Sequence, residues 1–495
     1  MIFEQLRAEF AHWSESALWR TSWALLAVAA YVFLAPNVDF APRLQWHDGQ
    51  RLAELMLLGI IVLANARTPA RHRIVSIWAN LAPWIRAALF AAFVLGLVSA
   101  AQSHLPRWAM LEWGLLLLLL IVVLAVAADR LAGGANIDRW IIVILYATAA
   151  AYVVKMVVVY VAMLTVGARY GMVFNVRDLY TGFSNIRFFG HVQTMLIPFL
   201  MLPALWWTRT SLQRICVGIV PVLWWMLAVA SGSRGTWVAL AIGVFAVLLF
   251  GGPSGRRWIK WQITGLFCGL FCYAIFVMLV PQLLEQPASF QHRAEDIISL
   301  SLRDVIWTSA INFSWENPLL GVGPMHFAYF ANTVAAHPHN AVLQFIAEWG
   351  FPAALLFTVV FATGGLTFAG RVRRIVTSPD ARTGMIAVAL LASLTGAAAQ
   401  AMVDGVLVMP VSQILLAMMI GWALGLYLTG NHETEQCGAL EKTLGAGIIV
   451  LAVASVVYGV QSEIGHVEQR EDAYLAAHPF IRLMPRFWAQ GWISE

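Results

Sequence analysis

Residues 110–129 of the chain read MLEWGLLLLLLIVVLAVAAD, and this apolar run decides the fold class. A helix needs about 20 mostly apolar residues to cross the hydrocarbon core of a bilayer. The strands of a membrane β-barrel alternate apolar and polar residues, which this run does not do. The run therefore predicts a transmembrane helix.

Similar apolar runs recur along the chain, and one of them, 52–66, is marginal in length. The candidate spans are 20–37, 52–66, 84–101, 110–129, 140–166, 191–207, 213–230, 236–251, 261–281, 341–369, 383–403, 407–429 and 443–461. We predict an all-α polytopic membrane protein with about 12–13 transmembrane helices.

The composition supports a membrane protein. Of the 495 residues, 60% are hydrophobic and 12% are charged, and the mean hydropathy is +0.75. Soluble domains carry roughly a quarter charged residues, so a soluble globule is excluded. The net charge of +5 reflects loop arginines, and no basic block is interleaved with aromatic residues, so we expect no nucleic-acid partner. The four cysteines have no metal-site spacing and imply no disulfide framework. The stretch 1–19 carries charges of both signs and predicts no cleaved signal peptide.

The distribution of Lys and Arg among the short loops predicts the orientation. If the N-terminus is cytoplasmic, alternate loops are consistently richer in arginine, as the positive-inside rule requires. Residues 169–190, the turn 231–235 and the long loop 282–340 then lie on the outer face. The expected organisation is N-terminal transmembrane helices over 1–281, a loop subdomain with short helices over 282–340, C-terminal transmembrane helices over 341–461 and a polar tail over 462–495. Within the loop, apolar residues at 297–315 have helix-like spacing and predict a helix there. We expect the polar tail to lie along the membrane surface.

The segment His337-Pro338-His339-Asn340 lies where the long loop meets a new apolar run. Imidazole exchanges a proton near neutral pH, so His337 or His339 could be a general base at the membrane surface. Two other interpretations stay open: Asn340 caps a helix with the histidines merely adjacent, or the pair binds a metal, although no third ligand has the right spacing.

Two carboxylates could contribute to the same site as the His337–Asn340 segment. Glu348 lies inside the apolar run that follows, where a charge requires a functional or structural reason, such as orienting a histidine or pairing with an arginine. Asp404 ends another span and could reach the same site.

Three arginines lie on the face that the positive-inside rule leaves poor in arginine: Arg187, Arg234 and Arg303. A single one of them is usually a headgroup contact or a snorkelling side chain. Three converging near a histidine predict a site for a diphosphate, because guanidinium groups bind phosphate oxygens in bidentate fashion. They could then stabilise the charge on a leaving diphosphate.

These segments together resemble the bacterial O-antigen ligases, within the wider group that also includes O-antigen polymerases and O-linked oligosaccharyltransferases. The resembling parts are Arg187-Phe188-Phe189-Gly190, the turn Ser231-Gly232-Ser233-Arg234-Gly235, Arg303 followed by residues 316–323, and His337 to Asn340 through Glu348-Trp349-Gly350. The similarity in motif covers roughly 180–355. Each motif is short, and their order and shared face carry the resemblance.

The resemblance implies a GT-C type glycosyltransferase of the bacterial inner membrane, whose long periplasmic loop closes over a cavity at the outer leaflet. It implies transfer of a glycan from undecaprenyl diphosphate to lipid A–core without a metal or other cofactor. By the same motifs, His339, with His337 as its rival, would deprotonate the acceptor hydroxyl. Arg187, Arg234 and Arg303 would bind the diphosphate, with Asn340, Glu348 and Asp404 in support. The chain offers two histidines where the family pattern has one. We expect an inverting, single displacement, because no pair of nucleophilic carboxylates is apparent.

Other functions remain open at this stage. An O-antigen polymerase would use a second carrier-linked glycan as its acceptor, and the motifs do not separate it from a ligase. An oligosaccharyltransferase that modifies proteins is less supported, since no extended C-terminal domain is apparent. A lipid-linked glycan transporter would place its polar residues near the bilayer midplane, whereas here they gather on one side.

Overall fold

The computed structural model describes residues 23–66, 68–170, 173–286, 302–330, 332, 334–378, 380–430, 438–477 and 483–494. Within these ranges the chain is helical and contains no β-strand. The fold is therefore an all-α polytopic membrane protein, as the apolar runs predict.

The helices of the first half of the chain are α2 (Trp23–Leu34), α3 (Trp46–Asn65), α4 (Thr68–Ala79), α5 (Pro83–Gln102), α6 (Pro106–Gly133), α7 (Ala135–Tyr170), the 3₁₀ helix η2 (Val176–Tyr180), α8 (Ile186–Leu200), α9 (Leu202–Trp206), α10 (Ser211–Ser231) and α11 (Arg234–Phe250). The remaining elements are α12 (Gly252–Tyr273), the π-helical η3 (Ala274–Leu279), α13 (Val280–Leu283), α14 (Arg303–Glu316), the 3₁₀ helix η5 (His326–Ala328), α15 (Ala341–Trp349), α16 (Phe351–Ile375), α17 (Ala381–Ala401), α18 (Pro410–Leu428), α19 (Ala439–Val460) and α20 (Val467–Ala477).

Ten helices among the described residues are long and apolar enough to cross a membrane. They are Pro83–Gln102, Pro106–Gly133, Ala135–Gly167, Ile186–Trp206, Ser211–Ser231, Gly252–Leu283, Phe351–Ile375, Ala381–Ala401, Pro410–Leu428 and Lys442–Val460. An eleventh candidate, α3 with α4, is bent by 97°. The apolar helices α2 and α11 are shorter. Each of the thirteen predicted runs thus overlaps a helix. Some of these helices, such as α2 and α11, are too short to meet the criterion for crossing a membrane alone.

The run predicted at 341–369 is not one helix. Gly350, with a φ of 82°, separates the short helix α15 from the spanning helix α16. A Cβ at Gly350 would lie 2.3 Å from the carbonyl oxygen of Leu319, so only glycine lets the 317–323 turn approach this break. The Val322 and Gly323 amides then donate to the carbonyls of Ala347 and Glu348, at 2.8 and 3.0 Å. This pairing explains why the two motif segments 316–323 and 348–350 occur together.

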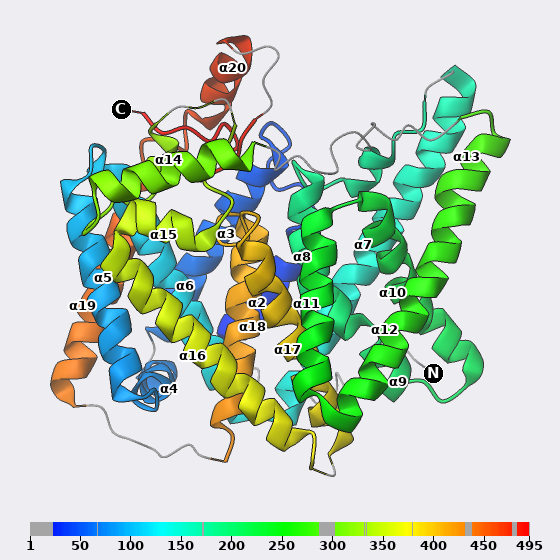
Figure 1. Ribbon diagram of the computed structural model, residues 1–495, viewed down its shortest axis with the longest axis horizontal. Helices are drawn as coiled ribbons and strands as arrows, with labels where there is room; N and C mark the ends of the chain where they lie inside the picture. The colour runs from blue at the N-terminus through cyan, green and yellow to red at the C-terminus, as the bar shows by residue number, and fades with distance from the viewer. Residues whose placement is uncertain are drawn as a thin grey trace.

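Helices α6, α8, α17 and α18 are the most buried spans and form the centre of the bundle. Helix α6 packs against both α18 and α19, and α17 packs against α8 and α11. Figure 1 shows α14 lying across one end of the bundle, with α20 at the same end; we call this the upper end.

The described residues between 302 and 340 pack at the upper end of the bundle (Figure 1). Ile306 and Ala310 of α14, Phe327 and Ala335 of the loop, and Ala347 of α15 make a separate apolar cluster. Helix α14 confirms a helix within the predicted 297–315 range, of which 297–301 lie outside the described residues.

Residues 483–494 do not lie along the surface as the sequence led us to expect. Arg486, Phe487, Trp488 and Ala489 are almost completely buried. Apolar and aromatic residues within an otherwise polar tail explain the difference, since their burial against α3 and α6 removes apolar surface from water.

Candidate active site

The His337–Asn340 segment is held in place from three sides. The Asn340 side chain accepts a hydrogen bond from the Leu343 amide at 3.0 Å, and it donates to the carbonyl of Met402 at 3.1 Å. It therefore caps α15 and also ties that helix to the turn between α17 and α18. On the other side, the indole of Trp307 on α14 donates to the carbonyl of Pro338 at 3.0 Å. The cap interpretation of Asn340 is confirmed, and the cap itself fixes where the histidines lie.

Asp404 lies between two histidines. Its Oδ1 is 3.4 Å from Nδ1 of His339, and its Oδ2 is 3.4 Å from Nε2 of His191. Burial alone would raise the pKa of Asp404, but His191 and His339 outweigh it and hold the pKa of this carboxyl well below its usual range. The carboxylate is therefore ionised and can orient an imidazole and stabilise its protonated form.

The two histidines of the segment differ in environment. His337 is buried, and its Nδ1 accepts a hydrogen bond from the backbone amide of His339 at 3.3 Å. Burial, reinforced by His339 and Arg486, lowers the pKa of His337 well below its usual range, so this ring is neutral. The His339 side chain is 15% exposed and has a carboxylate at Nδ1, which leaves Nε2 for a substrate. This arrangement favours His339 over His337 as a general base.

The three arginines all lie in the first turn of a helix. Arg187 is the second residue of α8, while Arg234 and Arg303 are the first residues of α11 and α14. A helix start carries a partial positive charge that disfavours a cation and attracts an anion. The arrangement therefore concentrates positive potential from both side chains and backbone.

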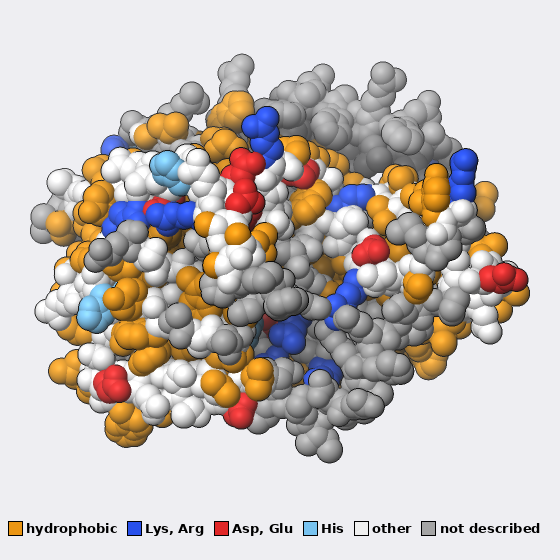
Figure 2. Space-filling model, turned by 90° about the horizontal axis from the view of Figure 1, so that it is seen from above, with side chains coloured by type: hydrophobic (Ala, Val, Ile, Leu, Met, Phe, Trp, Pro, Cys, Tyr) orange, Lys and Arg blue, Asp and Glu red, His pale blue; other side chains and the backbone are white. Residues whose placement is uncertain are grey.

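The arginines also influence one another. Burial lowers the pKa of Arg303, and Arg187 and Arg234 lower it further, whereas Asp404 opposes them. Among the described residues, neither Arg187 nor Arg303 forms an ion pair with a carboxylate within 4.0 Å. Figure 2, seen from the upper end, shows Lys and Arg side chains inside a hollow near the middle of this face. A cationic hollow of this kind can bind a polyanion.

Gly190 brings the helix starts together. A Cβ at Gly190 would lie 2.3 Å from Oγ1 of Thr236 on α11 and 3.6 Å from Nε2 of Gln400 on α17. The Gln400 amide in turn contacts Oγ1 of Thr236 at 3.4 Å. The glycine thus permits the first turns of α8 and α11 to pack beside the end of α17, which leads directly to Asp404.

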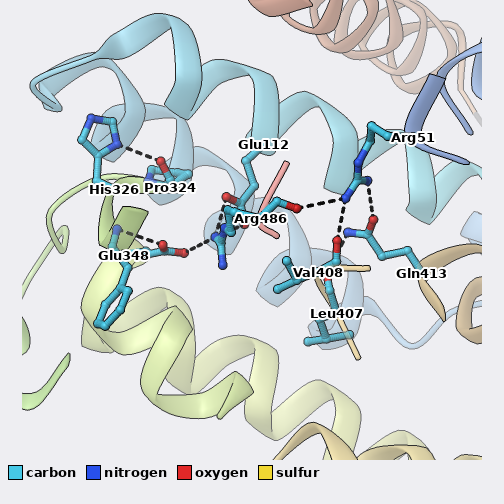
Figure 3. Close-up of polar contacts among 10 residues, drawn as sticks. Arg51, Glu112, Pro324, His326, Glu348, Leu407, Val408, Gln413 and Arg486 are labelled. Atoms are coloured by element: carbon cyan, nitrogen blue, oxygen red, sulfur yellow. Dashed lines mark hydrogen bonds and ion pairs between the residues drawn. The ribbon is translucent and has the colours of Figure 1, made fainter. Parts of the chain in front are cut away.

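Glu348 pairs with an arginine and makes no hydrogen bond to either histidine of the segment. Its Oε1 accepts from the Phe327 amide at 3.1 Å, and its Oε2 lies 2.7 Å from Nη2 of Arg486 (Figure 3). Burial raises the pKa of Glu348 to about 8, the nearby Glu112 adds to the effect, and Arg486 opposes it.

Sequence reasoning missed two residues at this site. His191 comes directly after the motif Arg187-Phe188-Phe189-Gly190 of α8. A histidine inside an apolar run is a signal that could have identified this residue. Arg486 lies far from every motif, and no pattern in the sequence marks it. No group of three or more His, Cys, Asp or Glu side chains among the described residues is arranged to hold a metal ion.

The fold and site define a polytopic helical membrane protein in which three interacting arginines lie near an Asp–His pair at one end of the bundle. A family model described as O-antigen ligase matches residues 196–358, a range that includes Arg234, Arg303, both histidines of the segment and Glu348. The match covers about a third of the chain and supports a protein of the O-antigen ligase and polymerase group. Comparison with curated proteins gave no match.

Proposed function

We propose that this protein is an O-antigen ligase. It transfers O-antigen polysaccharide from undecaprenyl diphosphate to the lipid A–core oligosaccharide at the periplasmic face of the inner membrane. The observation that carries the proposal is the meeting of an Asp404–His339 pair with three arginines at the starts of α8, α11 and α14. The family match supports the class of substrate, a lipid-linked glycan.

The proposed reaction is a single displacement with inversion. Nε2 of His339 accepts the proton of the acceptor hydroxyl as the oxygen attacks the anomeric carbon. Asp404, at Nδ1, stabilises the imidazolium that forms. The bond to the carrier diphosphate breaks on the opposite face, and Arg187, Arg234 and Arg303 stabilise the negative charge that develops there. His337, Asn340 and Glu348 hold the segment in place.

The upper end of the bundle faces the periplasm in this proposal. The arginine-rich loops then lie in the cytoplasm, as the positive-inside rule favours. The division into N-terminal helices, loop subdomain, C-terminal helices and tail follows the same topology.

A transfer assay with purified protein tests the proposal. The donor is undecaprenyl-diphosphate-linked glycan, the acceptor is lipid A–core, and parallel reactions contain EDTA to test the proposed independence of metal ions. The variants are His339→Ala, His337→Ala and, as a control outside the site, His466→Ala. We expect transfer by the wild type with and without EDTA, near loss in His339→Ala and normal rates in His466→Ala.

Other outcomes would redirect the assignment. Glycan that lengthens on its own carrier while lipid A–core is ignored would identify a polymerase instead. Loss of transfer in His337→Ala with a normal His339→Ala would exchange the roles of the two histidines. If an active donor gives neither product with the wild type, the proposed activity is wrong.

A further inference from the structure

Segment 483–494 lies inside the protein next to the candidate site. Arg486 is 2% exposed and its Nη2 lies 2.7 Å from carboxylate oxygens of both Glu112 on α6 and Glu348 on α15. Figure 3 shows the guanidinium between the two carboxylates, which come from opposite sides. One side chain of this segment therefore joins the loop subdomain to the central helix of the bundle.

The same segment is tied to the turn that carries Asp404. Arg51 donates from Nε to the carbonyl of Phe487 at 3.2 Å and from Nη2 to the carbonyl of Val408 at 2.6 Å. Gln413, which accepts from Nη1 of Arg51 at 2.7 Å, donates to the carbonyl of Leu407 at 2.7 Å. Arg51 thus connects segment 483–494 to the chain just after Asp404 (Figure 3).

The segment also contacts the loop that carries the histidines. The Ile493 amide donates to the carbonyl of Ala328 at 3.2 Å. Gly491 has a φ of 89°, and a Cβ there would lie 3.1 Å from that of Ala336, the residue before His337. Segment 483–494 is therefore packed between the two parts of the chain that supply His339 and Asp404.

We infer that Arg486 is a positioning residue, which fixes the loop and α15 against α6 and so sets the separation of His339 from Asp404. The catalytic consequence rests on the proposed function, whereas the anchoring of the loop does not. The ion-pair partners of Arg486 are Glu112 and Glu348, and neither is a proposed reacting or phosphate-binding group. Loss of Arg486 should therefore lower kcat and leave donor binding intact.

The anchoring is tested without any activity measurement. In a background with the four cysteines replaced by serine, Ala335→Cys places a thiol on the loop at a residue that is 4% exposed. Leu475→Cys, on α20 and 39% exposed, is the matched control. We expect Arg486→Gln to raise the rate of labelling of Cys at 335 by a membrane-impermeant maleimide about tenfold or more, because local opening exposes buried sites. Labelling at 475 should not change.

Transfer kinetics test the catalytic part. We expect Arg486→Gln to lower kcat about 100-fold, the cost of a misplacement of about 1 Å, and to leave the donor KM within about threefold. Arg486→Lys keeps the charge but loses the guanidinium geometry, so it should recover kcat only in part, to about three- to tenfold below wild type. A role in stability alone would lower the amount of active protein in both variants and would not give this graded effect on kcat per active molecule.

Each result decides the inference. Unchanged labelling at 335 in Arg486→Gln would overturn the anchoring, and an unchanged kcat would overturn the positioning role while the proposed function stands. If Arg486→Gln does not reach the membrane, Arg486→Lys decides: a labelling rate and kcat both equal to wild type would refute the inference. If the wild type itself transfers nothing, the proposed function fails, and the labelling alone decides whether Arg486 anchors the loop.

Discussion

Replacing Asp404 with Asn tests whether the carboxylate stabilises a protonated His339. The substitution keeps the shape and the acceptor for the Gly405 amide, 2.9 Å away, but removes the negative charge. In the proposed reaction the imidazolium forms only as the acceptor proton is transferred. The loss should therefore fall on kcat, since the interaction is stronger in the transition state than in the ground state.

The separation of the charges gives the size of the effect. At the 3.4 Å between Nδ1 and Oδ1, two unit charges interact by about 1.2 kcal/mol at the dielectric constant of water and about 5 kcal/mol at an effective dielectric of about 20. Asp404 is buried and the His339 side chain is 15% exposed, which places the pair nearer the second value. We expect a loss of about 3–4 kcal/mol, or roughly 10²–10³-fold in kcat.

The assay measures kcat and the donor KM for Asp404→Asn and wild type, with thermal unfolding in the same detergent as a control for folding. We expect the donor KM to stay within about threefold. A kcat within about threefold of wild type would refute the reasoning. A raised KM with normal kcat would instead show that Asp404 acts on Arg303, whose pKa it raises against the effect of burial.

Three further predictions follow from the geometry. Arg303→Lys keeps the charge but loses the guanidinium fork, so the donor KM should rise about tenfold; an unchanged KM would remove Arg303 from the diphosphate site. Gly190→Ala should destabilise the protein by about 1–3 kcal/mol through overpacking, and Thr236→Ala in the same chain should restore the melting temperature. Because the folded pKa of Glu348 is raised to about 8, its contribution to stability should be present below its unfolded value of about 4.3 and be lost as the pH rises toward 8. The melting temperature of wild type should fall relative to Glu348→Gln over that range, and parallel pH profiles would contradict the assignment.

The fold could be predicted from the sequence because a bilayer imposes a simple rule on helix length and hydropathy. The same rule failed at residues 341–369, where apolar character continues through the break at Gly350. The Gly350-Phe351-Pro352 sequence carries a signal for that break, since glycine permits a positive φ and proline favours a first helical turn.

The site was only partly predictable, for a different reason. His339 and Arg303 lie in motifs whose residue types already indicate proton transfer and anion binding. The contacts of Asp404 with His191 and of Arg486 with Glu112 and Glu348 join residues more than a hundred positions apart. Such pairs depend on how helices pack, and one sequence does not encode that packing in any local pattern.

The arginines at the starts of α8, α11 and α14 have a consequence for the evolution and engineering of this protein. Each occupies a first-turn position where Asp or Glu would make a more stable helix, and Arg187 and Arg234 also act unfavourably on Arg303. Local choices that oppose stability are expected where function requires them. A redesign that optimised the first turn of every helix would therefore remove these arginines, giving a more stable membrane protein that, under the proposed function, would no longer bind the donor diphosphate.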